Sequence, residues 1–465
     1  MQTELRWIQR PFTELFRLAW PIAVSMLSLS VMSIVDTYFV SGLGADALAG
    51  VGLASTAMFT LVCFSNGLLR SIKVLVSQAV GAGRAADAPL YLSGGLVLAG
   101  GFGLLAVLLS EIIAPHLGSL SATVEAGQHA TTYLRIRSLS APCFLVFIAV
   151  REFSYGRGES RLPMMCSLMA NVCNAILCYA FVGLAGLGVA GAAVATVIAC
   201  TLEMSLLLWA RWSDLARLAR PRLSAIAALW RVGVPTGVQF GLEVGALALL
   251  AALLSMLSEV EMAAHQLVFH LLMLAFLPTN AIAEAGSVQA GQAVGANRDD
   301  LVPGVARRVL VMASTYGALC TAILLLFGRD ILAAFTSESA LATVALRLVH
   351  IAAVFLIVDG ANMVARGILR GTGDVRYPAV ICILCSWVCT PPLTWLLGYR
   401  AGLGAAGGWI GLCLEVTACA ALLWWRLRRG SWLHAAACSR AHILSSASSA
   451  PVDTSQALPV AAGAG

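Results

Sequence analysis

Long runs of apolar residues recur along the whole chain and constrain its fold more than any other feature. Twelve runs lie near residues 12–41, 47–80, 90–113, 131–150, 163–183, 187–210, 230–257, 261–294, 305–327, 341–365, 377–398 and 403–425. A helix that crosses a bilayer needs about 20 predominantly apolar residues, which such runs supply. Because 60% of the residues are hydrophobic and only 11% are charged, the chain carries more apolar surface than a soluble protein can bury. The sequence therefore predicts an all-α membrane protein with 12 transmembrane helices in the lipid bilayer, and it excludes a soluble enzyme.

The distribution of arginine predicts how these helices are oriented. The N-terminus, the even-numbered connections and the C-terminal segment carry 21 arginines, among them Arg151, Arg366 and Arg370, whereas the other loops carry only Arg329 and Arg400. Basic residues accumulate on the cytoplasmic side of membrane proteins. Both termini are therefore expected in the cytoplasm, in a multi-pass protein of the plasma membrane (the inner membrane of a bacterium). Because the arginines fall in loops between apolar runs, no nucleic-acid partner is expected.

The two halves of the chain repeat each other at an offset of about 215 residues. The segment QAVGA at 78–82 recurs at 292–296, and the pattern GxGxxRxP at 156–163 recurs at 371–378. Since six helices is an even number, the second half enters from the same side as the first, which gives the parallel repeats of one transporter architecture. Two such bundles enclose a central cleft, which rocking would open to alternate sides. The expected parts are an N-lobe of helices 1–6, a cytoplasmic linker, a C-lobe of helices 7–12 and a disordered cytoplasmic tail, at 12–212, 213–229, 230–428 and 429–465.

Several segments resemble one family of transporters. They are residues 20–49, residues 76–83 (VSQAVGAG), Glu243, residues 264–266 (AHQ) and residues 370–374 (RGTGD). In register over about residues 12–428, they resemble the multidrug and toxic compound extrusion (MATE) family and its NorM-like bacterial branch. The resemblance implies a monomeric secondary antiporter that needs no cofactor other than its coupling ion. Such a protein exports amphipathic organic compounds (drugs, toxins or metabolites) in exchange for inward H⁺ or Na⁺.

Acidic residues inside the apolar runs are candidates for the coupling site. A carboxylate at bilayer depth costs several kcal/mol by insertion scales, so each one is a functional candidate by default. The six are Asp36, Glu203, Glu243, Glu284, Asp359 and Glu415. Of these, Glu203 and Glu415 are expected to be protonated or paired for packing.

Asp36 belongs to a predicted cluster in the N-lobe. Asn174 and Thr196 lie on consecutive helices that enter the membrane from opposite sides. At 1.5 Å per residue, both residues reach a depth of roughly 15 Å, near the midplane. Carboxylate, amide and hydroxyl oxygens suit Na⁺, while the carboxylate alone suffices for a proton. The resemblance implies that these residues form an N-lobe cation site with Tyr133. Cys178 stands where archaeal relatives carry a second acid, which favours protonation of Asp36 over a full Na⁺ cage.

Glu243 and Asp359 are the predicted coupling acids of the C-lobe, because they match the acids to which the NorM-like branch owes its Na⁺ or H⁺ coupling. Two like charges that share a site of low dielectric constant cannot both stay ionised without a cation, so either Na⁺ binds or one proton remains. Phe355, one turn before Asp359, stands where that branch often has tyrosine. The sequence leaves the choice between Na⁺ and H⁺ open.

Arg70 and Lys73 are cations inside the second apolar run, and Arg70 matches Glu284 at the repeat offset. We predict that Arg70 and Glu284 pair across the cleft as a gate; the alternative is that Arg70 reaches the cytoplasmic headgroups. His265 and Gln266 are further cleft candidates, although His265 is expected to make an interhelical hydrogen bond rather than bind a metal. A basic cleft would disfavour cationic drugs, so the substrate's charge stays open.

Two other functions compete with the antiporter. A flippase or exporter of a lipid-linked or peptidic intermediate would use a related architecture, often with two more helices. An intramembrane protease is suggested by the letters GxGD at residues 371–374, but this segment lies in an arginine-rich turn. No Ser/His dyad or HExxH motif accompanies it, so an enzyme is not expected.

Overall fold

The computed structural model describes residues 5–121, 123–218, 220–336 and 338–448, and this part of the chain is helical, without a strand. Within it, 11 helical segments are long and apolar enough to cross a membrane, and α4 with α5, bent by 48°, makes up to a twelfth. The first half contains α1 (Pro11–Ser41), α2 (Ala45–Gly81), α3 (Ala88–Ile113), α4 (Val124–Ser138), α5 (Ala141–Gly156), α6 (Arg161–Cys178), α7 (Gly188–Ala210) and the short α8 (Trp212–Leu215). The second half contains α9 (Leu223–Ser255), α10 (Glu259–Gly295), α11 (Val302–Phe335), α12 (Ser339–Gly371), α13 (Arg376–Leu393), α14 (Ala405–Arg429) and α15 (Leu433–Ser448). The predicted fold class is confirmed.

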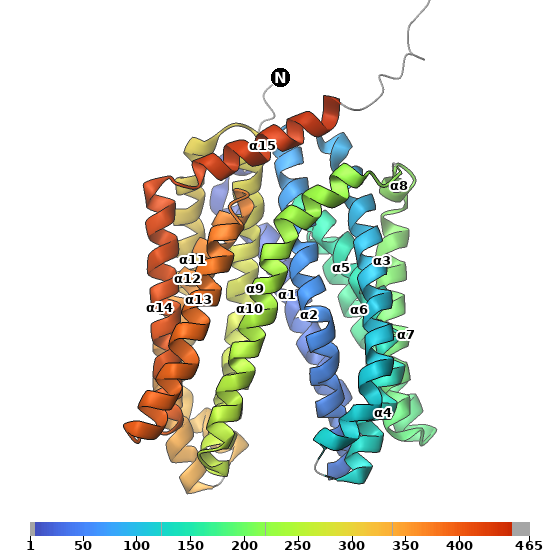
Figure 1. Cartoon of the computed structure of the whole chain (residues 1–465), viewed down its shortest axis with the longest axis vertical. Coiled ribbons are helices and arrows are strands. Elements are labelled where there is room, and N and C mark those ends of the chain that lie inside the picture. Colours follow the sequence, from blue (N-terminus) through green and yellow to red (C-terminus); the bar gives the residue numbers. More distant parts are fainter. Residues whose placement is uncertain (1–4, 122, 219, 337, 449–465) are drawn as a thin grey trace, which may run out of the picture.

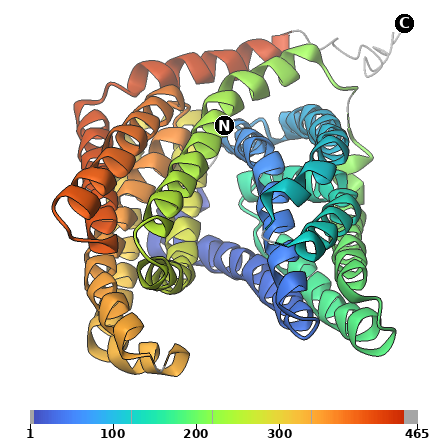
Figure 2. The ribbon, with the colours of Figure 1, turned by 60° about the horizontal axis from the view of Figure 1, so that its bottom comes forward.

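Two lobes of similar construction stand side by side, α1–α7 in one and α9–α14 in the other (Figures 1 and 2). The repeat extends to irregular features. α6 and α13 each continue into a π-helical turn, at Tyr179–Leu184 and Thr394–Arg400, and these turns begin 215 residues apart. The duplication read from the sequence is therefore a duplication of structure.

The helix bounds differ from the sequence expectation at two places. The fourth run, expected near 131–150, is the bent pair α4 and α5, with Pro142 in the first turn of α5. Proline cannot donate the backbone hydrogen bond that would continue α4, so the chain bends there. The expected linker, 213–229, holds the end of α8 and the first turns of α9.

The first helix of each lobe also packs on the opposite lobe. Leu15 and Ile22 of α1 belong to the same buried cluster as Val288 of α10. In the second half, Ala225 and Leu229 of α9 belong to the buried cluster of the N-lobe. These crossed contacts join the two lobes at one end of the bundle.

The tail helix α15 corrects the prediction that everything after residue 428 is disordered. Gly430 adopts a left-handed conformation (φ 73°) that ends α14 and turns the chain. α15 then runs across the ends of the lobes (Figure 1), and Trp432, just before it, is buried together with Ala436 and Ile443 of the helix. This burial compensates for the low hydrophobicity that predicted disorder. Residues 449–465 of the expected tail lie outside the described residues. We call the end of the bundle that carries α15 the tail face.

At the tail face the repeated QAVGA segment of α2 packs against its own copy on α10. A Cβ atom on Gly81 would overlap the carbonyl oxygen of Gln292, and one on Gly295 would overlap that of Gln78. The contact is reciprocal, as expected for two repeats related by a twofold axis. Glycine allows the two backbones to approach this closely. The two lobes are therefore closed against each other at the tail face.

Candidate functional site

The structure brings together the N-lobe residues expected to bind a cation. Asp36 of α1 is 6% exposed and accepts hydrogen bonds from Thr196 Oγ1 of α7 at 2.9 Å and from Cys178 Sγ of α6 at 3.4 Å. Asn174 Nδ2 lies 3.5 Å from Thr196 Oγ1, and Asn174 Oδ1 has no hydrogen-bond partner within the described part of the chain. Three helices of one lobe thus meet at a buried carboxylate.

Two residues of α4 complete the surroundings of Asp36. Tyr133, predicted from the resemblance, is buried, and both Tyr133 and Arg137 interact electrostatically with Asp36. Arg137 also lies against Ser140 Oγ. Sequence reasoning missed Arg137, although a charged residue inside the apolar run 131–150 was a signal that could have found it. Within the described ranges, no lysine or arginine nitrogen lies within 4.0 Å of the Asp36 carboxylate.

In the C-lobe, a protein cation already accompanies the predicted coupling acid. Arg366 Nη1 of α12 lies 2.8 Å from Glu243 Oε1 of α9, and Gln239 Nε2 donates to the same oxygen at 2.9 Å. The side chain of Asp359 is buried, with Asn362 Nδ2 at 3.5 Å from its Oδ1. The expectation that the two acids require Na⁺ or a shared proton is therefore incomplete, because Arg366 supplies a positive charge.

Three arginines expected in loops lie inside the lobes. Arg151 (α5) and Arg366 (α12) are buried, and Arg370, one turn after Arg366, is largely buried. Arg366 and Arg370 are four residues apart and share one face of α12. Arg366 lies seven residues after the intramembrane Asp359, and this spacing was the signal in the sequence that the two arginines lie inside the lobe. Their inward direction depends on how α12 packs against α10 and α9.

A cluster of charges joins the lobes at the position predicted for the Arg70–Glu284 pair. Arg70 Nη1 of α2 lies 2.9 Å from Glu284 Oε1 of α10, and Lys73 forms an ion pair with Glu284 Oε2. Lys73 Nζ is also 3.5 Å from Glu152 of α5, which accepts a hydrogen bond from Arg151 Nη2 at 3.1 Å. Two cations of α2, Arg70 and Lys73, therefore share the carboxylate of Glu284 on α10. Its role as a gate stays a prediction.

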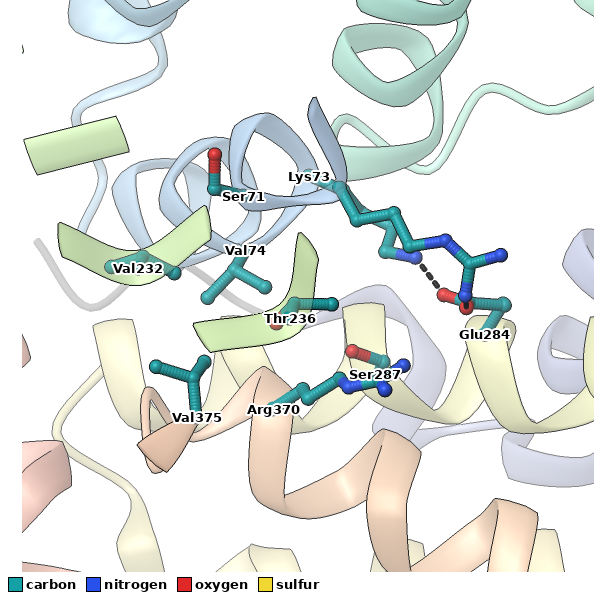
Figure 3. A pocket seen from close by; sticks show the side chains of 10 residues that line it. Ser71, Lys73, Val74, Val232, Thr236, Glu284, Ser287, Arg370 and Val375 are labelled. Carbon is teal, nitrogen blue, oxygen red and sulfur yellow. Dashed lines mark hydrogen bonds and ion pairs between the residues drawn. The ribbon is translucent and has the colours of Figure 1, made fainter. Parts of the chain in front are cut away.

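A small cavity lies between the lobes at this cluster. It is lined by Arg70, Ser71, Lys73, Val74, Val232, Thr236, Glu284, Ser287, Arg370 and Val375. In Figure 3, Lys73 points toward Glu284, and Arg370 lies on the opposite side of the cavity. Residues of both lobes therefore converge on one charged space.

The structure does not bring His265 and Gln266 to this cluster. His265 is buried between α10 and α14 and accepts a hydrogen bond from Trp409 Nε1 at 3.2 Å, the type of interhelical contact expected for it. Gln266 is exposed. At 1.5 Å per residue, both lie about 28 Å along α10 from Glu284.

The remaining intramembrane acids and the GxGD letters have local partners. Glu203 accepts a hydrogen bond from Ser167 at 2.5 Å, and Glu415 accepts one from Thr390. Asp374, the acid of the GxGD segment, forms an ion pair with Arg426 at 2.5 Å. Among the described residues no group of three or more His, Cys, Asp and Glu side chains could hold a metal ion.

A duplicated bundle of membrane-spanning helices, with buried acids in each lobe and a charged seam between the lobes, is the architecture of a membrane transporter. The family model MatE matches the chain twice, over residues 21–180 and 235–396, once in each repeat. The chain belongs to the MatE family, as its sequence motifs predict.

Curated relatives and solved structures agree with this assignment. The chain is 30% identical to the probable multidrug resistance protein NorM of Pseudomonas putida, over 90% of this chain and 96% of that protein. It is also 30% identical to the multidrug resistance protein NorM of Burkholderia vietnamiensis, over 90% and 94%. A transporter of the MOP superfamily from Pyrococcus furiosus has the same fold, with a TM-score of 0.85 and 21% identity over 93% of this chain and 99% of that one. An outward-facing multidrug resistance MATE transporter matches with a TM-score of 0.84, 21% identity and the same coverage.

Proposed function

We propose that this protein is a secondary antiporter that exports amphipathic organic compounds in exchange for inward H⁺. It acts as a monomer in the plasma membrane, which is the inner membrane of a bacterium. The names of the NorM relatives support multidrug export, and the duplicated lobes support transport by rocking. The surplus of arginine at the tail face supports a cytoplasmic location for that face and for both termini.

The proposal depends on the surroundings of the Asp36 carboxylate. Its carboxylate is buried, receives hydrogen bonds from a hydroxyl and a thiol, and has no basic nitrogen within 4.0 Å in the described ranges. A buried carboxylate in such a place is costly when charged, so it takes up a proton when it cannot reach water. A proton that binds in one access state and leaves in the other shifts the population of the two states and drives export.

Two contacts favour H⁺ over Na⁺. The thiol of Cys178 occupies one oxygen of Asp36, and a thiol is a poor ligand for a hard cation. In the C-lobe, the guanidinium of Arg366 takes the position beside Glu243 that a sodium ion would need. In both lobes, a thiol or a guanidinium therefore contacts the carboxylate oxygen that a Na⁺ ion would need as a ligand.

Proteoliposomes with separately imposed pH and Na⁺ gradients test the coupling. We expect the pH gradient alone to drive dye export, and we expect Asp36→Asn to abolish this export while it preserves dye binding. Glu125→Gln, which removes an exposed acid of α4, is the matched control and should transport like the wild type. Export driven by Na⁺ alone, or full proton-driven export by Asp36→Asn, would contradict the proposal.

A further inference from the structure

The cavity between the lobes carries an excess of positive charge. Among the residues that the structure describes, three basic side chains line it (Arg70, Lys73 and Arg370), but only one acidic side chain does (Glu284). The hydroxyls of Ser71, Ser287 and Thr236 also line it. The charged residues around the cavity do not cancel this excess, because each acid there is paired with an arginine. Arg151 accompanies Glu152, and Arg366 accompanies Glu243.

Arg370 is the cation of this cavity that lacks an acidic partner. Its Nη2 donates to the amide oxygen of Gln239 at 3.0 Å, and its buried Nε has no hydrogen-bond partner among the described residues. In the part of the chain that the structure describes, no carboxylate oxygen lies within 4.0 Å of its guanidinium. An uncompensated buried charge is unfavourable, and a planar guanidinium with free donors is suited to a carboxylate, sulfonate or phosphate.

Glu284 is the acidic partner of the other two cations, Arg70 and Lys73, and acts as an internal anion. Arg70 and Lys73 come from the N-lobe and Glu284 from the C-lobe, so these contacts exist only while the lobes are closed here. When the lobes part at the tail face, Arg70 and Lys73 lose their acidic partner on α10. Arg70 and Arg370 then face a newly opened space, together with Lys73, which keeps Glu152 of its own lobe as a neighbour.

Apolar groups lie next to these charges. Val74, Val232 and Val375 line the cavity, and the guanidinium of Arg70 lies 5.7 Å from the ring centroid of Phe240. The rings of Phe59 and Phe240 pack edge to face, with their centroids 6.1 Å apart. The surroundings thus match a molecule that has an anionic group attached to an apolar or aromatic body.

We propose that the exported compounds are amphipathic organic anions or zwitterions, whose negative group binds Arg370, Arg70 and Lys73 in place of Glu284. The inference rests on the proposed export function and specifies its substrate class. The substrate anion and the Glu284 carboxylate compete for the same cations. Release of the substrate therefore frees Arg70 and Lys73 to pair with Glu284 and close the seam.

Two dyes that share a xanthene ring but differ in charge test the substrate class. Proteoliposomes are given a pH gradient, and export of anionic sulforhodamine B is compared with export of cationic tetramethylrhodamine methyl ester, each corrected for leakage from protein-free vesicles. We expect Arg370→Gln to lower the anion-to-cation export ratio about tenfold, the effect of losing one hydrogen bond to a charged group. Arg370→Lys should retain most of this ratio. The matched control Arg376→Gln, an exposed arginine nearby, should leave it unchanged.

A binding measurement tests the competition. Because Glu284→Gln removes the internal anion, we expect purified Glu284→Gln protein to bind sulforhodamine B about tenfold more tightly than the wild type, measured by fluorescence anisotropy. Unchanged affinity overturns the inference, as does an equal loss of both dyes in Arg370→Gln. Chloride-dependent export of the cationic dye that stops in Arg370→Gln also overturns it, because the cluster would then hold an inorganic anion. Export of the cationic dye alone refutes only this inference, whereas no proton-driven export of either dye refutes the proposed function.

Discussion

Lys73 links three elements through a single side chain. It is the only lysine of the chain and is 3% exposed, and it contacts Glu284 of α10 and Glu152 of α5 from its position on α2. A buried ion pair contributes little net stability relative to an apolar pair, but the loss of one partner leaves a buried charge uncompensated. At the scale of one residue, Lys73 therefore joins the acids of two lobes, Glu152 and Glu284, through one ammonium group.

Lys73→Met should lower the free energy of unfolding by about 2 kcal/mol, because Glu152 and Glu284 lose the ammonium that they share and keep one arginine each, Arg151 and Arg70. Thermal unfolding of the purified protein, followed by tryptophan fluorescence, measures the change. The matched control is Arg135→Met, which breaks an exposed ion pair with Glu111 (3.2 Å) and should cost less than about 1 kcal/mol. Equal shifts in the two variants would show that the Lys73 cluster does not stabilise the fold.

Residue-level reasoning from the sequence found some contacts of the site and missed others. The repeat offset predicted that Arg70 and Glu284 lie opposite each other, and helix depth predicted that Asp36, Asn174 and Thr196 lie together. The pairing of Glu243 with Arg366 was not predicted. Both residues were visible in the sequence, but the direction of a charged side chain from a membrane helix depends on neighbouring helices.

At the scale of elements, α15 bridges the two lobes on the tail face. Ser439 donates to Gln78 Oε1 of α2 at 2.6 Å, and Arg440 forms an ion pair with Asp299 at 3.0 Å, between α10 and α11. Contacts to both lobes from one helix favour the closed arrangement, since they could not all persist if the lobes parted as the proposed rocking requires.

Deletion of residues 431–465 should therefore raise the reaction rate of Lys73 with an amine-specific reagent by about thirtyfold, because two interactions of about 1 kcal/mol each are lost and each 1.4 kcal/mol corresponds to a factor of ten. Mass spectrometry of the Lys73 peptide measures the rate. Deletion of residues 449–465 keeps α15 and is the matched control. If both deletions leave Lys73 equally protected, α15 does not hold the lobes together.

At the scale of the whole molecule, closure of the tail face requires two glycines. Gly81 and Gly295 lie at equivalent positions of the repeats, and each faces a backbone carbonyl of the other lobe. The QAVGA repeat was recognised in the sequence as a mark of duplication. The structure adds a physical reason for its glycines, which is close backbone contact between the copies.

Gly295→Ala should prevent full closure, because the added methyl group overlaps the carbonyl oxygen of Gln78. We expect loss of transport together with faster labelling of Lys73. Gly100→Ala, at a position of α3 with no neighbour within 4 Å of the added carbon, is the matched control. It should transport normally and be slightly stabilised, by up to about 1 kcal/mol of helix propensity. Normal closure in Gly295→Ala would contradict the role of the seam.

The sequence by itself determined the membrane class, the number of helices, the duplication and the family. These features are set by local hydropathy and by the length needed to cross a bilayer, so they can be read without knowing which helices touch. Only the tertiary structure decided that Arg366 pairs with Glu243, that Arg370 has no acidic partner among the described residues, and that α15 folds across both lobes. Such contacts join residues far apart in the chain, and their energies depend on packing partners that no single segment specifies.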